Sequence, residues 1–330
     1  MLIEFLVTVI LTFALTAVFS RILIPKLKSL KVGQKILDIG PRWHKNKEGT
    51  PTMGGLAFIA ANIIVFAIAL PFLAKYETVN LWGTVICFLF ALSNGLIGII
   101  DDRAKIFKKQ NQGLTAPQKY LLQLISAGLF LFFMTLVGAI STEIYIPFVN
   151  KAVDFGWFYY VFSLILITGF VNSVNLTDGL DGLASSVTFV VAGFFAVAAF
   201  ACGISELSIF AGLVIGATLG FLVYNFYPAK IFMGDTGSLY LGGMVVAMAY
   251  LLGNPMILFL VGIIYLAESF SVILQVAYFK LTHGKRLFKM SPIHHHFEKC
   301  SWSEIKIVFV FSIVTLIFCV IAWFGLARPI

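Results

Sequence analysis

The chain has 330 residues, of which 60% are hydrophobic and only 12% are charged. Soluble globular domains carry about 25% charged residues, so this composition excludes an ordinary soluble domain and favours a protein embedded in lipid. The net charge is +8, but in such a chain the placement of the charges matters more than their sum, and no nucleic-acid partner is expected.

Ten apolar segments are each expected to cross a membrane as a helix, because a span needs about 20 mostly apolar residues. They are continuous rather than alternating in hydropathy, which argues against a β-barrel. The first lacks a basic start and a small-residue cleavage site, so we expect it to be retained. The segments are residues 2–24, 53–74, 81–100, 117–139, 156–175, 183–202, 206–224, 238–252, 255–280 and 303–326. We therefore predict an all-α polytopic membrane protein, with residues 1–330 forming a single integral membrane domain.

The loops between the ten segments alternate between two sides of the membrane, and both termini fall on the same side. One set of loops comprises residues 25–52, 101–116, 176–182, 225–237 and 281–302. This set carries 16 lysine and arginine residues, whereas the other side carries only Lys75, Lys151 and Arg328. The positive-inside rule assigns the basic side to the cytoplasm. Both termini are therefore expected to lie outside the cytoplasm.

Three further features of the sequence indicate structure rather than chemistry. Residues 141–156 alternate polar and apolar residues, which predicts a small β-hairpin. Gly212, Gly216 and Gly220 are spaced for close helix packing, and we favour packing within one subunit over dimerisation. The four cysteines lie far apart without a CxxC pair, so neither a disulfide framework nor a zinc ribbon is expected.

The first polar cluster on the basic side is "DDRAK", which begins with Asp101 and Asp102 at the end of the third segment. Adjacent acids at a membrane surface suit Mg²⁺, which prefers carboxylate and phosphate oxygens. The alternative is a solvated acidic pair that Arg103 and Lys105 balance, and the pair alone does not decide between them.

The second cluster is "NLTDGLDGLA", which joins two apolar segments. If it starts a helix, Asp178 and Asp181 lie near one face of the first turn. A helix cap accounts for one acid, but not for two acids beside Gly179 and Gly182, which permit close approach of a ligand to the backbone.

The third cluster is "MGDTGSLYLGG", in which glycines flank Asp235. A glycine-rich turn that leads into a helix offers backbone N–H groups to a phosphate. The sequence lacks the GK[ST] ending of a Walker A loop. A membrane re-entry turn with a capping aspartate is the alternative.

The fourth cluster is "PIHHHFE", with His294, His295 and His296 in succession. On a helix these side chains point about 100° apart, so they cannot all face one ion. A donor role toward phosphates or a leaving group suits them better than zinc, which needs spaced ligands.

Two more regions are candidates for function. The glycine-rich loop of residues 41–58 contains His44, Lys45 and Lys47, which suit an anion or a nucleotide as well as they suit positive-inside anchoring. Glu268 lies within the ninth segment, and an acid within the membrane is a functional hypothesis by default. This helix is expected to break or bend, exposing Gln275 toward the cytoplasm.

Five acids, three histidines and several lysines therefore converge on one membrane face. Such a set suits Mg²⁺-assisted phosphoryl transfer, in which the metal offsets charge and cations help the leaving group depart. The location implies one lipid substrate and one cytosolic nucleotide.

These motifs resemble the polyprenyl-phosphate N-acetylhexosamine-1-phosphate transferases, in the order of that family and over most of the chain. "PIHHHFE" and "EGTPTMGG" resemble the bacterial phospho-N-acetylmuramoyl-pentapeptide transferases within it. The resemblance implies a ten-helix enzyme of the bacterial cytoplasmic membrane that depends on Mg²⁺ and is often a homodimer. It implies transfer of phospho-MurNAc-pentapeptide from UDP-MurNAc-pentapeptide to undecaprenyl phosphate, giving lipid I and UMP in peptidoglycan synthesis.

The resemblance also implies roles for particular residues. Asp235 matches the metal ligand, and Asp101, Asp102, Asp235 and His294 match residues of the catalytic centre. The remaining matches are substrate-binding residues: Lys105, Lys119, Asn175, Asp178, Asp181, Asn225, Phe232, Gly234, Gln275, His295 and His296. For Asp178 and Asp181 we expect contact with the nucleotide rather than the metal.

Alternatives remain open at this point. A one-step attack by the lipid phosphate and a two-step route through an aspartyl phosphate both fit the sequence, and we favour one step. A sibling enzyme that transfers phospho-GlcNAc is the nearest alternative function, although the histidine loop argues against it. A secondary transporter would use Glu268 at mid-depth, but five of the six candidate acids lie at one surface.

Overall fold

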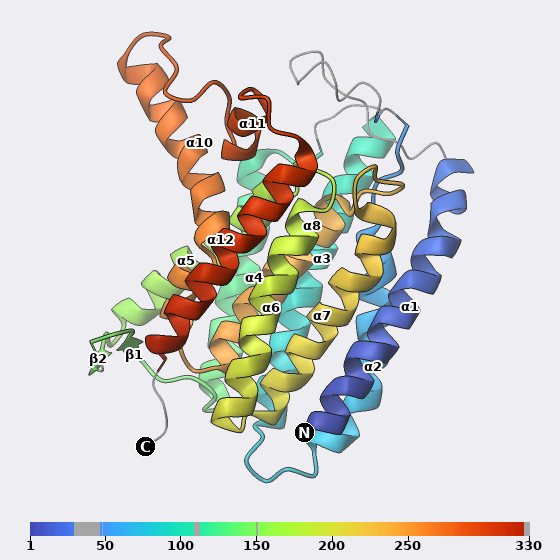
Figure 1. Ribbon diagram of the computed structural model, residues 1–330. Coiled ribbons are helices and arrows are strands. Elements are labelled where there is room, and N and C mark those ends of the chain that lie inside the picture. The colour runs from blue at the N-terminus through green and yellow to red at the C-terminus, as the bar shows by residue number, and fades with distance from the viewer. Residues whose placement is uncertain (30–46, 48, 109–112, 150, 327–330) are drawn as a thin grey trace.

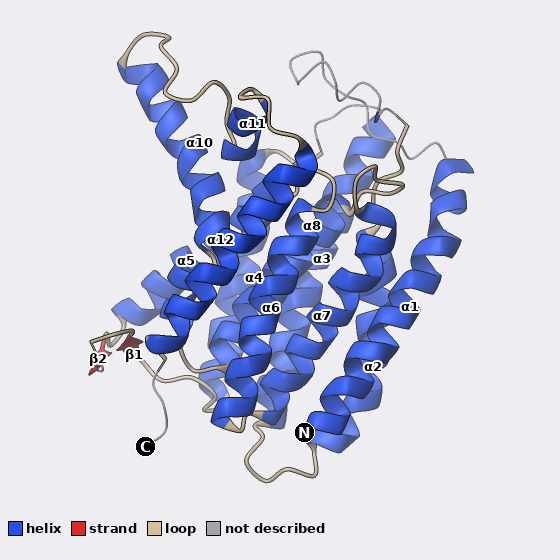
Figure 2. Ribbon diagram, in the orientation of Figure 1, coloured by secondary structure: helices blue, strands red, loops and turns tan. Residues whose placement is uncertain are grey.

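The chain folds as a bundle of long helices with one small β-hairpin at one end (Figures 1 and 2). The computed structural model describes residues 1–29, 47, 49–108, 113–149 and 151–326. The first eight helices are α1 (Leu2–Ser29), α2 (Gly55–Leu73), α3 (Leu81–Lys108), α4 (Ala116–Leu136), α5 (Phe158–Thr177), α6 (Leu183–Cys202), α7 (Ser205–Asn225) and α8 (Gly234–Leu251). The others are the 3₁₀ turn η2 (Pro255–Ile257), α9 (Leu258–Val261), α10 (Ile263–Leu281), α11 (Ile293–Glu298) and α12 (Glu304–Phe324).

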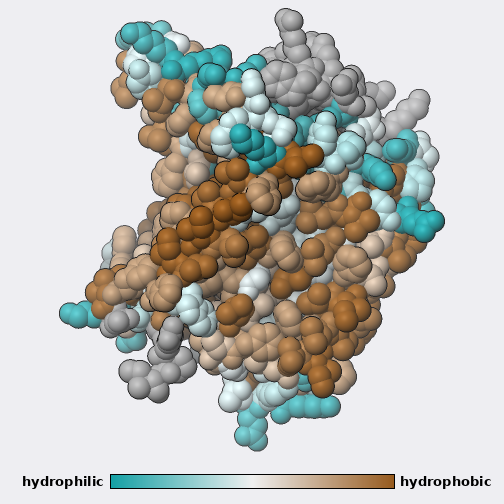
Figure 3. Space-filling model, viewed as in Figure 1, coloured by the Kyte–Doolittle hydropathy of each residue, from teal (hydrophilic) through white to brown (hydrophobic). Residues whose placement is uncertain are grey.

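Nine helices in the described part of the chain are long and apolar enough to cross a membrane. They are α1 to α7, α10 and α12. The protein is therefore a polytopic helical membrane protein, as the apolar segments predict. Figure 3 shows hydrophobic residues over the middle of the bundle and hydrophilic residues gathered toward its upper end. In Figure 1, α1 begins and α12 ends at the same, lower end.

The eighth predicted segment is the buried centre of the bundle rather than a lipid-facing helix. α8 is buried continuously from Thr236 to Tyr250, and it packs against α2, α3 and α5. Glycines allow these close contacts, because a Cβ at Gly242 would meet the Val171 backbone and a Cβ at Gly243 would meet Ala91. A helix that protein encloses does not need the hydropathy of a lipid-facing span.

The ninth predicted segment is not one continuous helix, so the expectation of a single span over 255–280 is wrong. The helix breaks at Gly262 (φ −95°, ψ 20°) between α9 and α10. A Cβ at this position would lie 2.5 Å from the Phe170 ring, so the close packing requires glycine. α10 then diverges from the bundle (Figure 1), which confirms the expected break.

Two smaller expectations are confirmed. Strands β1 (Glu143–Ile146) and β2 (Lys151–Asp154) form an antiparallel hairpin in which Glu143 pairs with Asp154. The glycine row of α7 packs against α1 of the same chain, where Gly212, Gly216 and Gly220 lie against Thr8, Thr12 and Thr16.

Candidate active site

Three carboxylates from two helices form the centre of the candidate site. Asp101 and Asp102 on α3 and Asp235 on α8 each offer an oxygen within 4.8 Å of the others. Asp101 and Asp102 are both only 3% exposed. A Cβ at Gly98 would overlap the Asp235 carbonyl group, so the glycine one turn before the acid pair brings α8 close enough to α3 to complete the cluster.

Asp102 caps the start of α8. Its Oδ2 accepts hydrogen bonds from the Thr236 N–H at 2.9 Å and the Thr236 hydroxyl at 2.8 Å. Its Oδ1 accepts a longer one from the Asp235 N–H at 3.3 Å. Gly234 has φ +69°, and a Cβ there would lie 2.5 Å from Asp102 Oδ2. The first N–H groups of α8 thus bind a carboxylate of the protein, which corrects the expectation that they are offered to a phosphate.

Two lysines and an amide surround Asp235. Lys105 Nζ lies 2.7 Å from Asp101 Oδ2, 3.5 Å from Asp102 Oδ1 and 2.9 Å from Asp235 Oδ2. Lys119 Nζ lies 2.8 Å from Asp235 Oδ2. Asn175 Nδ2 donates to Asp235 Oδ1 at 3.0 Å. Asp235 therefore contacts side chains that lie 130, 116 and 60 positions away in the sequence, and all three are residues that the sequence had selected.

The composition of the cluster suits a hard divalent cation. All three acidic side chains offer oxygen, the ligand that Mg²⁺ prefers. With every group ionised, the three carboxylates and the two ammonium groups of Lys105 and Lys119 leave one net negative charge. The residues present therefore fit a bound divalent metal ion.

A second polar cluster forms around Asp181. Lys47 Nζ lies 2.7 Å from Asp181 Oδ1 and 2.6 Å from Glu304 Oε2. The Ala229 N–H donates to Asp181 Oδ2 at 2.8 Å. The sequence identified Lys47 as an anion-binding candidate, but gave no sign of Glu304, an acid at the start of the last helix.

Asn225 and Phe232 hold the loop between α7 and α8, Asn225 through its side chain and Phe232 through its backbone. Asn225 is buried, and its Nδ2 donates to the Ile231 carbonyl at 2.9 Å. The Phe232 N–H donates to the Pro51 carbonyl at 2.8 Å, and its own carbonyl accepts from the Gly54 N–H at 2.8 Å. The Phe232 contacts fasten the loop before α8 to the loop before α2, and the Asn225 contact closes the loop between α7 and α8.

Asp178 is the C-terminal cap of α5, and Asp181 lies in the turn before α6. Neither acid lies in the first turn of a helix, so that expectation is wrong. Gly182, with φ +76°, begins α6 only after both acids. Burial raises the pKa of the Asp178 carboxyl well above its ordinary value, and the charges of Asp235, Asp102 and Asp181 add to this effect. Asp178 is thus under the electrostatic influence of both acidic clusters.

The histidine run lies on the short helix α11, and its three side chains have different partners. His294 Nδ1 lies 3.0 Å from Glu268 Oε2, and His295 Nδ1 lies 2.6 Å from Glu298 Oε2. His296 Nδ1 accepts from the Lys289 N–H at 3.1 Å. The three rings therefore do not converge on one ion.

Gln275 has a different surrounding from the one expected. Its Oε1 accepts from the Leu287 and Phe288 N–H groups at 3.1 and 2.8 Å. It is half-buried and fastens the 282–292 loop to α10.

The chain matches known proteins over nearly its whole length. Residues 84–253 match the family model described as glycosyl transferase family 4, and residues 47–59 match signature 1 of the phospho-N-acetylmuramoyl-pentapeptide-transferases. A phospho-N-acetylmuramoyl-pentapeptide-transferase from Clostridium novyi (strain NT) is 49% identical over 97% of this chain and 96% of that protein. Proteins of the same name from Clostridium perfringens (strain 13 / Type A) and Halalkalibacterium halodurans are 47% and 44% identical, over 98% and 96% of this chain and 99% and 96% of their own lengths.

The chain belongs to the phospho-N-acetylmuramoyl-pentapeptide-transferases. It is a transferase and a multi-pass protein of the bacterial cytoplasmic membrane. The match to glycosyl transferase family 4 includes Asp101, Asp102, Asn175 and Asp235, whereas the match to the transferase signature includes Lys47. The matched ranges therefore include residues of both polar clusters. His44 and Lys45 lie outside the described residues.

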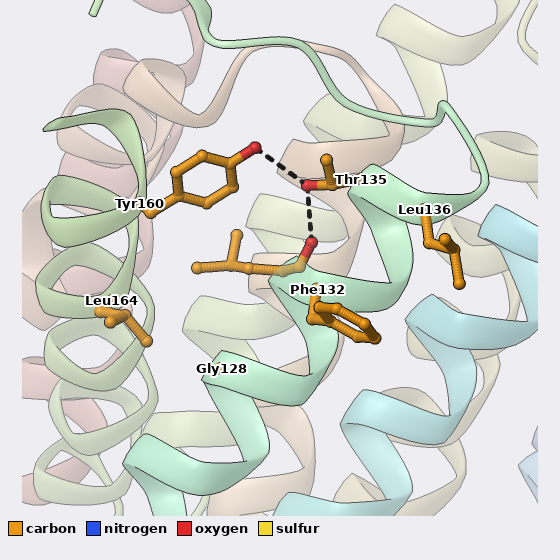
Figure 4. A pocket seen from close by; sticks show the side chains of 7 residues that line it. Gly128, Phe132, Thr135, Leu136, Tyr160 and Leu164 are labelled. Carbon is orange, nitrogen blue, oxygen red and sulfur yellow. Dashed lines mark hydrogen bonds between the residues drawn. The ribbon is translucent and has the colours of Figure 1, made fainter. Parts of the chain in front are cut away.

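An apolar pocket of about 360 Å³ lies elsewhere in this transferase, between the later turns of α4 and the first turns of α5. Its residues are Gly128, Leu131, Phe132, Thr135, Leu136, Tyr160 and Leu164. Figure 4 shows its two polar contacts: the Thr135 hydroxyl lies 3.3 Å from the Tyr160 hydroxyl and donates to the Leu131 carbonyl at 2.8 Å. The pocket contains no carboxylate, lysine or histidine and does not include any of the predicted site residues.

Proposed function

We propose that this chain transfers phospho-MurNAc-pentapeptide from UDP-MurNAc-pentapeptide to undecaprenyl phosphate. The products are lipid I and UMP, in the first membrane step of peptidoglycan synthesis. The observation that carries the proposal is the buried cluster of Asp101, Asp102 and Asp235 with Lys105 and Lys119, in a chain that shares 49% of its residues with a named transferase. The whole chain acts as one integral membrane domain, and we expect it to form a homodimer.

We propose ten spans with both termini outside the cytoplasm. Nine helices have the length and hydropathy of spans, and α8 supplies the tenth from within the bundle. The 16 basic residues of one loop set favour the cytoplasm for the end that carries the polar clusters. A soluble nucleotide sugar and a lipid phosphate then meet at this face.

Asp235, Asp101 and Asp102 are the residues that would hold Mg²⁺. A bound ion would supply positive charge that offsets the charge of the substrate phosphates in the transition state. Lys105 and Lys119 offset phosphate charge beside it, and Asn175 fixes the Asp235 carboxylate by its 3.0 Å hydrogen bond.

The remaining predicted residues form the substrate-binding walls. Asp178, Asp181, Asn225, Phe232 and Gly234 bind the nucleotide side. The helix α11 and its loop supply His294, His295 and His296 to the phosphates or the uridine, with Gln275 at the base of that loop. Support comes from the contacts of Phe232, which join the loop before α8 to the loop before α2, and from Asn225, which closes the loop before α8.

In the reaction, an oxygen of the lipid phosphate attacks the phosphorus that bears the sugar. The new P–O bond forms as the bond to the UMP oxygen breaks, and UMP leaves with the electron pair. A phosphate monoester has a second pKa of about 6, so the lipid phosphate is largely dianionic at neutral pH and attacks without a strong base. One step is therefore sufficient.

Asp102→Asn tests the role of Asp102 in the geometry of the cluster, and a trapping experiment tests the one-step route. The Asp102 carboxylate accepts hydrogen bonds from the N-terminus of α8. Replacing it by an amide is therefore expected to disturb the geometry of the cluster. We expect kcat to fall by about 10²-fold with little change in binding of the UDP-sugar, measured by isothermal titration. A phosphorylated aspartate trapped by mixing enzyme with UDP-sugar alone would contradict the one-step route.

The proposed function itself is tested by UMP release. Purified protein in lipid nanodiscs with undecaprenyl phosphate is expected to release UMP from UDP-MurNAc-pentapeptide and not from UDP-GlcNAc. The reverse preference would indicate the sibling phospho-GlcNAc transferase. Solute uptake by proteoliposomes without lipid I synthesis would indicate a transporter instead.

A further inference from the structure

Glu268 is an acid buried within a membrane-spanning helix, and the proposed reaction does not yet use it. It lies on α10 and is 0% exposed. A buried carboxylate is costly unless it is paired and hydrogen-bonded. Glu268 is therefore expected to have a polar partner nearby.

The partner of Glu268 is His294, which lies on α11, beyond the 282–292 loop that follows α10. Glu268 Oε2 lies 3.0 Å from His294 Nδ1, and the His294 N–H approaches the same oxygen at 3.5 Å. His294 is 1% exposed. Since a carboxylate only accepts hydrogen bonds, we assign a proton to Nδ1. The pair holds the imidazole in one orientation through contacts to both its ring and its backbone.

The other ring nitrogen of His294 faces the loop between α5 and α6. Nε2 is buried and has no hydrogen-bond partner among the described residues. It lies directly against Gly179, where an added Cβ would overlap the ring. Gly179 separates Asp178 from Leu180 in the loop between α5 and α6. The unpaired nitrogen therefore lies against the loop that carries Asp178 and Asp181.

The neighbouring histidine repeats the arrangement. His295 Nδ1 lies 2.6 Å from Glu298 Oε2, and the two histidine rings have centroids 4.1 Å apart. Histidines that act on a ligand through one ring nitrogen commonly have the other held by a carboxylate, which fixes tautomer and orientation. Two adjacent histidines with this pairing favour a functional arrangement over a single structural ion pair.

We propose that Glu268 is a positioning residue for His294. By holding the Nδ1 proton, it directs Nε2–H toward an anionic oxygen of the substrate diphosphate at the 178–182 loop. Glu268 does not touch the substrate. A histidine ring that donates from Nε2 while Nδ1 keeps its proton is an imidazolium, and the Glu268 carboxylate stabilises the charge of that ring. The proposal rests on the proposed transferase function and adds to it the residue that orients the donor.

The test is a double-mutant cycle of Glu268→Gln and His294→Ala, measured as kcat and KM for UMP release by full-length enzyme in nanodiscs. Glu268→Gln keeps the size of the side chain, and we expect kcat to fall roughly 10- to 100-fold, the usual effect of losing such a partner. In the His294→Ala background the same change is expected to alter kcat by less than about 2-fold, because Glu268 acts only through the ring that this background lacks, and about 2-fold is the scatter of such cycles. Equal losses in both backgrounds would overturn the proposal.

Ser271→Ala is the matched control. Ser271 is buried one turn farther along α10, and its hydroxyl donates to the Glu268 carbonyl rather than to the carboxylate. We expect its kcat to match that of the wild type. A loss as large as that of Glu268→Gln would assign the effect to packing of α10.

A spectroscopic readout separates positioning from folding. The ¹⁵N shifts of labelled histidine, with His294 assigned from the His294→Ala spectrum, are expected to report a protonated Nδ1 in the wild type and an altered ring state in Glu268→Gln. An unchanged His294 signal in Glu268→Gln would contradict the proposal. An inactive wild type would instead refute the proposed function, and the ring measurement would still test the pair.

Discussion

Asp235→Asn is expected to lower kcat roughly 10²- to 10³-fold, the loss seen when one electrostatic element of a catalytic site is removed. Asp235 is the carboxylate on which Lys105, Lys119 and Asn175 converge. Asparagine keeps the shape but removes the charge. The cluster then changes from one net negative charge to none, so it loses its attraction for a divalent ion.

The measurement is UMP release, together with Mn²⁺ binding followed by electron paramagnetic resonance as a probe that does not depend on turnover. Asp154→Asn is the control, because Asp154 is an exposed acid of the β2 strand far along the chain from the cluster. Its own carboxylate accepts hydrogen bonds from the Thr142 hydroxyl at 2.5 Å and from the Gly156 N–H at 2.9 Å. Wild-type Mn²⁺ affinity and turnover in Asp235→Asn would refute the assigned role of the cluster.

The spans were predictable because hydropathy and helix length are properties of contiguous sequence. Nine of the ten segments contain a helix with the character of a span. The sequence could not distinguish α8, whose neighbours are protein on all sides, from a helix that faces lipid. The sequence predicted that this helix breaks but not that it breaks at Gly262, because the position depends on the Phe170 ring of another helix.

The residues of the site were predictable by type, whereas their partners were not. Asp101, Asp102 and Asp235 stood out as acids at the ends of apolar segments, and the structure brings them together. The pairing of Lys47 with Glu304, and of His294 with Glu268, joins residues more than 25 positions apart. Such pairs follow from the packing of helices that local patterns do not encode. Likewise, Asp102 binds the N–H groups at the start of α8 that the sequence assigned to a phosphate.

Gly98→Ala is expected to impair the enzyme without changing any polar side chain. An added Cβ would overlap the Asp235 carbonyl, and it would lie 2.6 Å from the Thr236 Cα. Relief requires α3 to move from α8, which separates Asp101 and Asp102 from Asp235. Overpacking of this kind costs about 1–3 kcal/mol of unfolding free energy. A misplacement of about 1 Å in a catalytic site costs about 10²-fold in rate, so kcat should fall by about that factor.

The control is Gly169→Ala on α5, where an added Cβ meets nothing within 4 Å. Both are helical glycines replaced by the same residue, so the change in backbone entropy is matched and only the contact with α8 differs. Thermal unfolding in nanodiscs and UMP release are measured for both variants. If Gly98→Ala keeps wild-type kcat and Mn²⁺ affinity, α3 and α8 can separate without consequence. The spacing of the two helices would then not determine activity, and the carboxylate cluster would not be the catalytic centre.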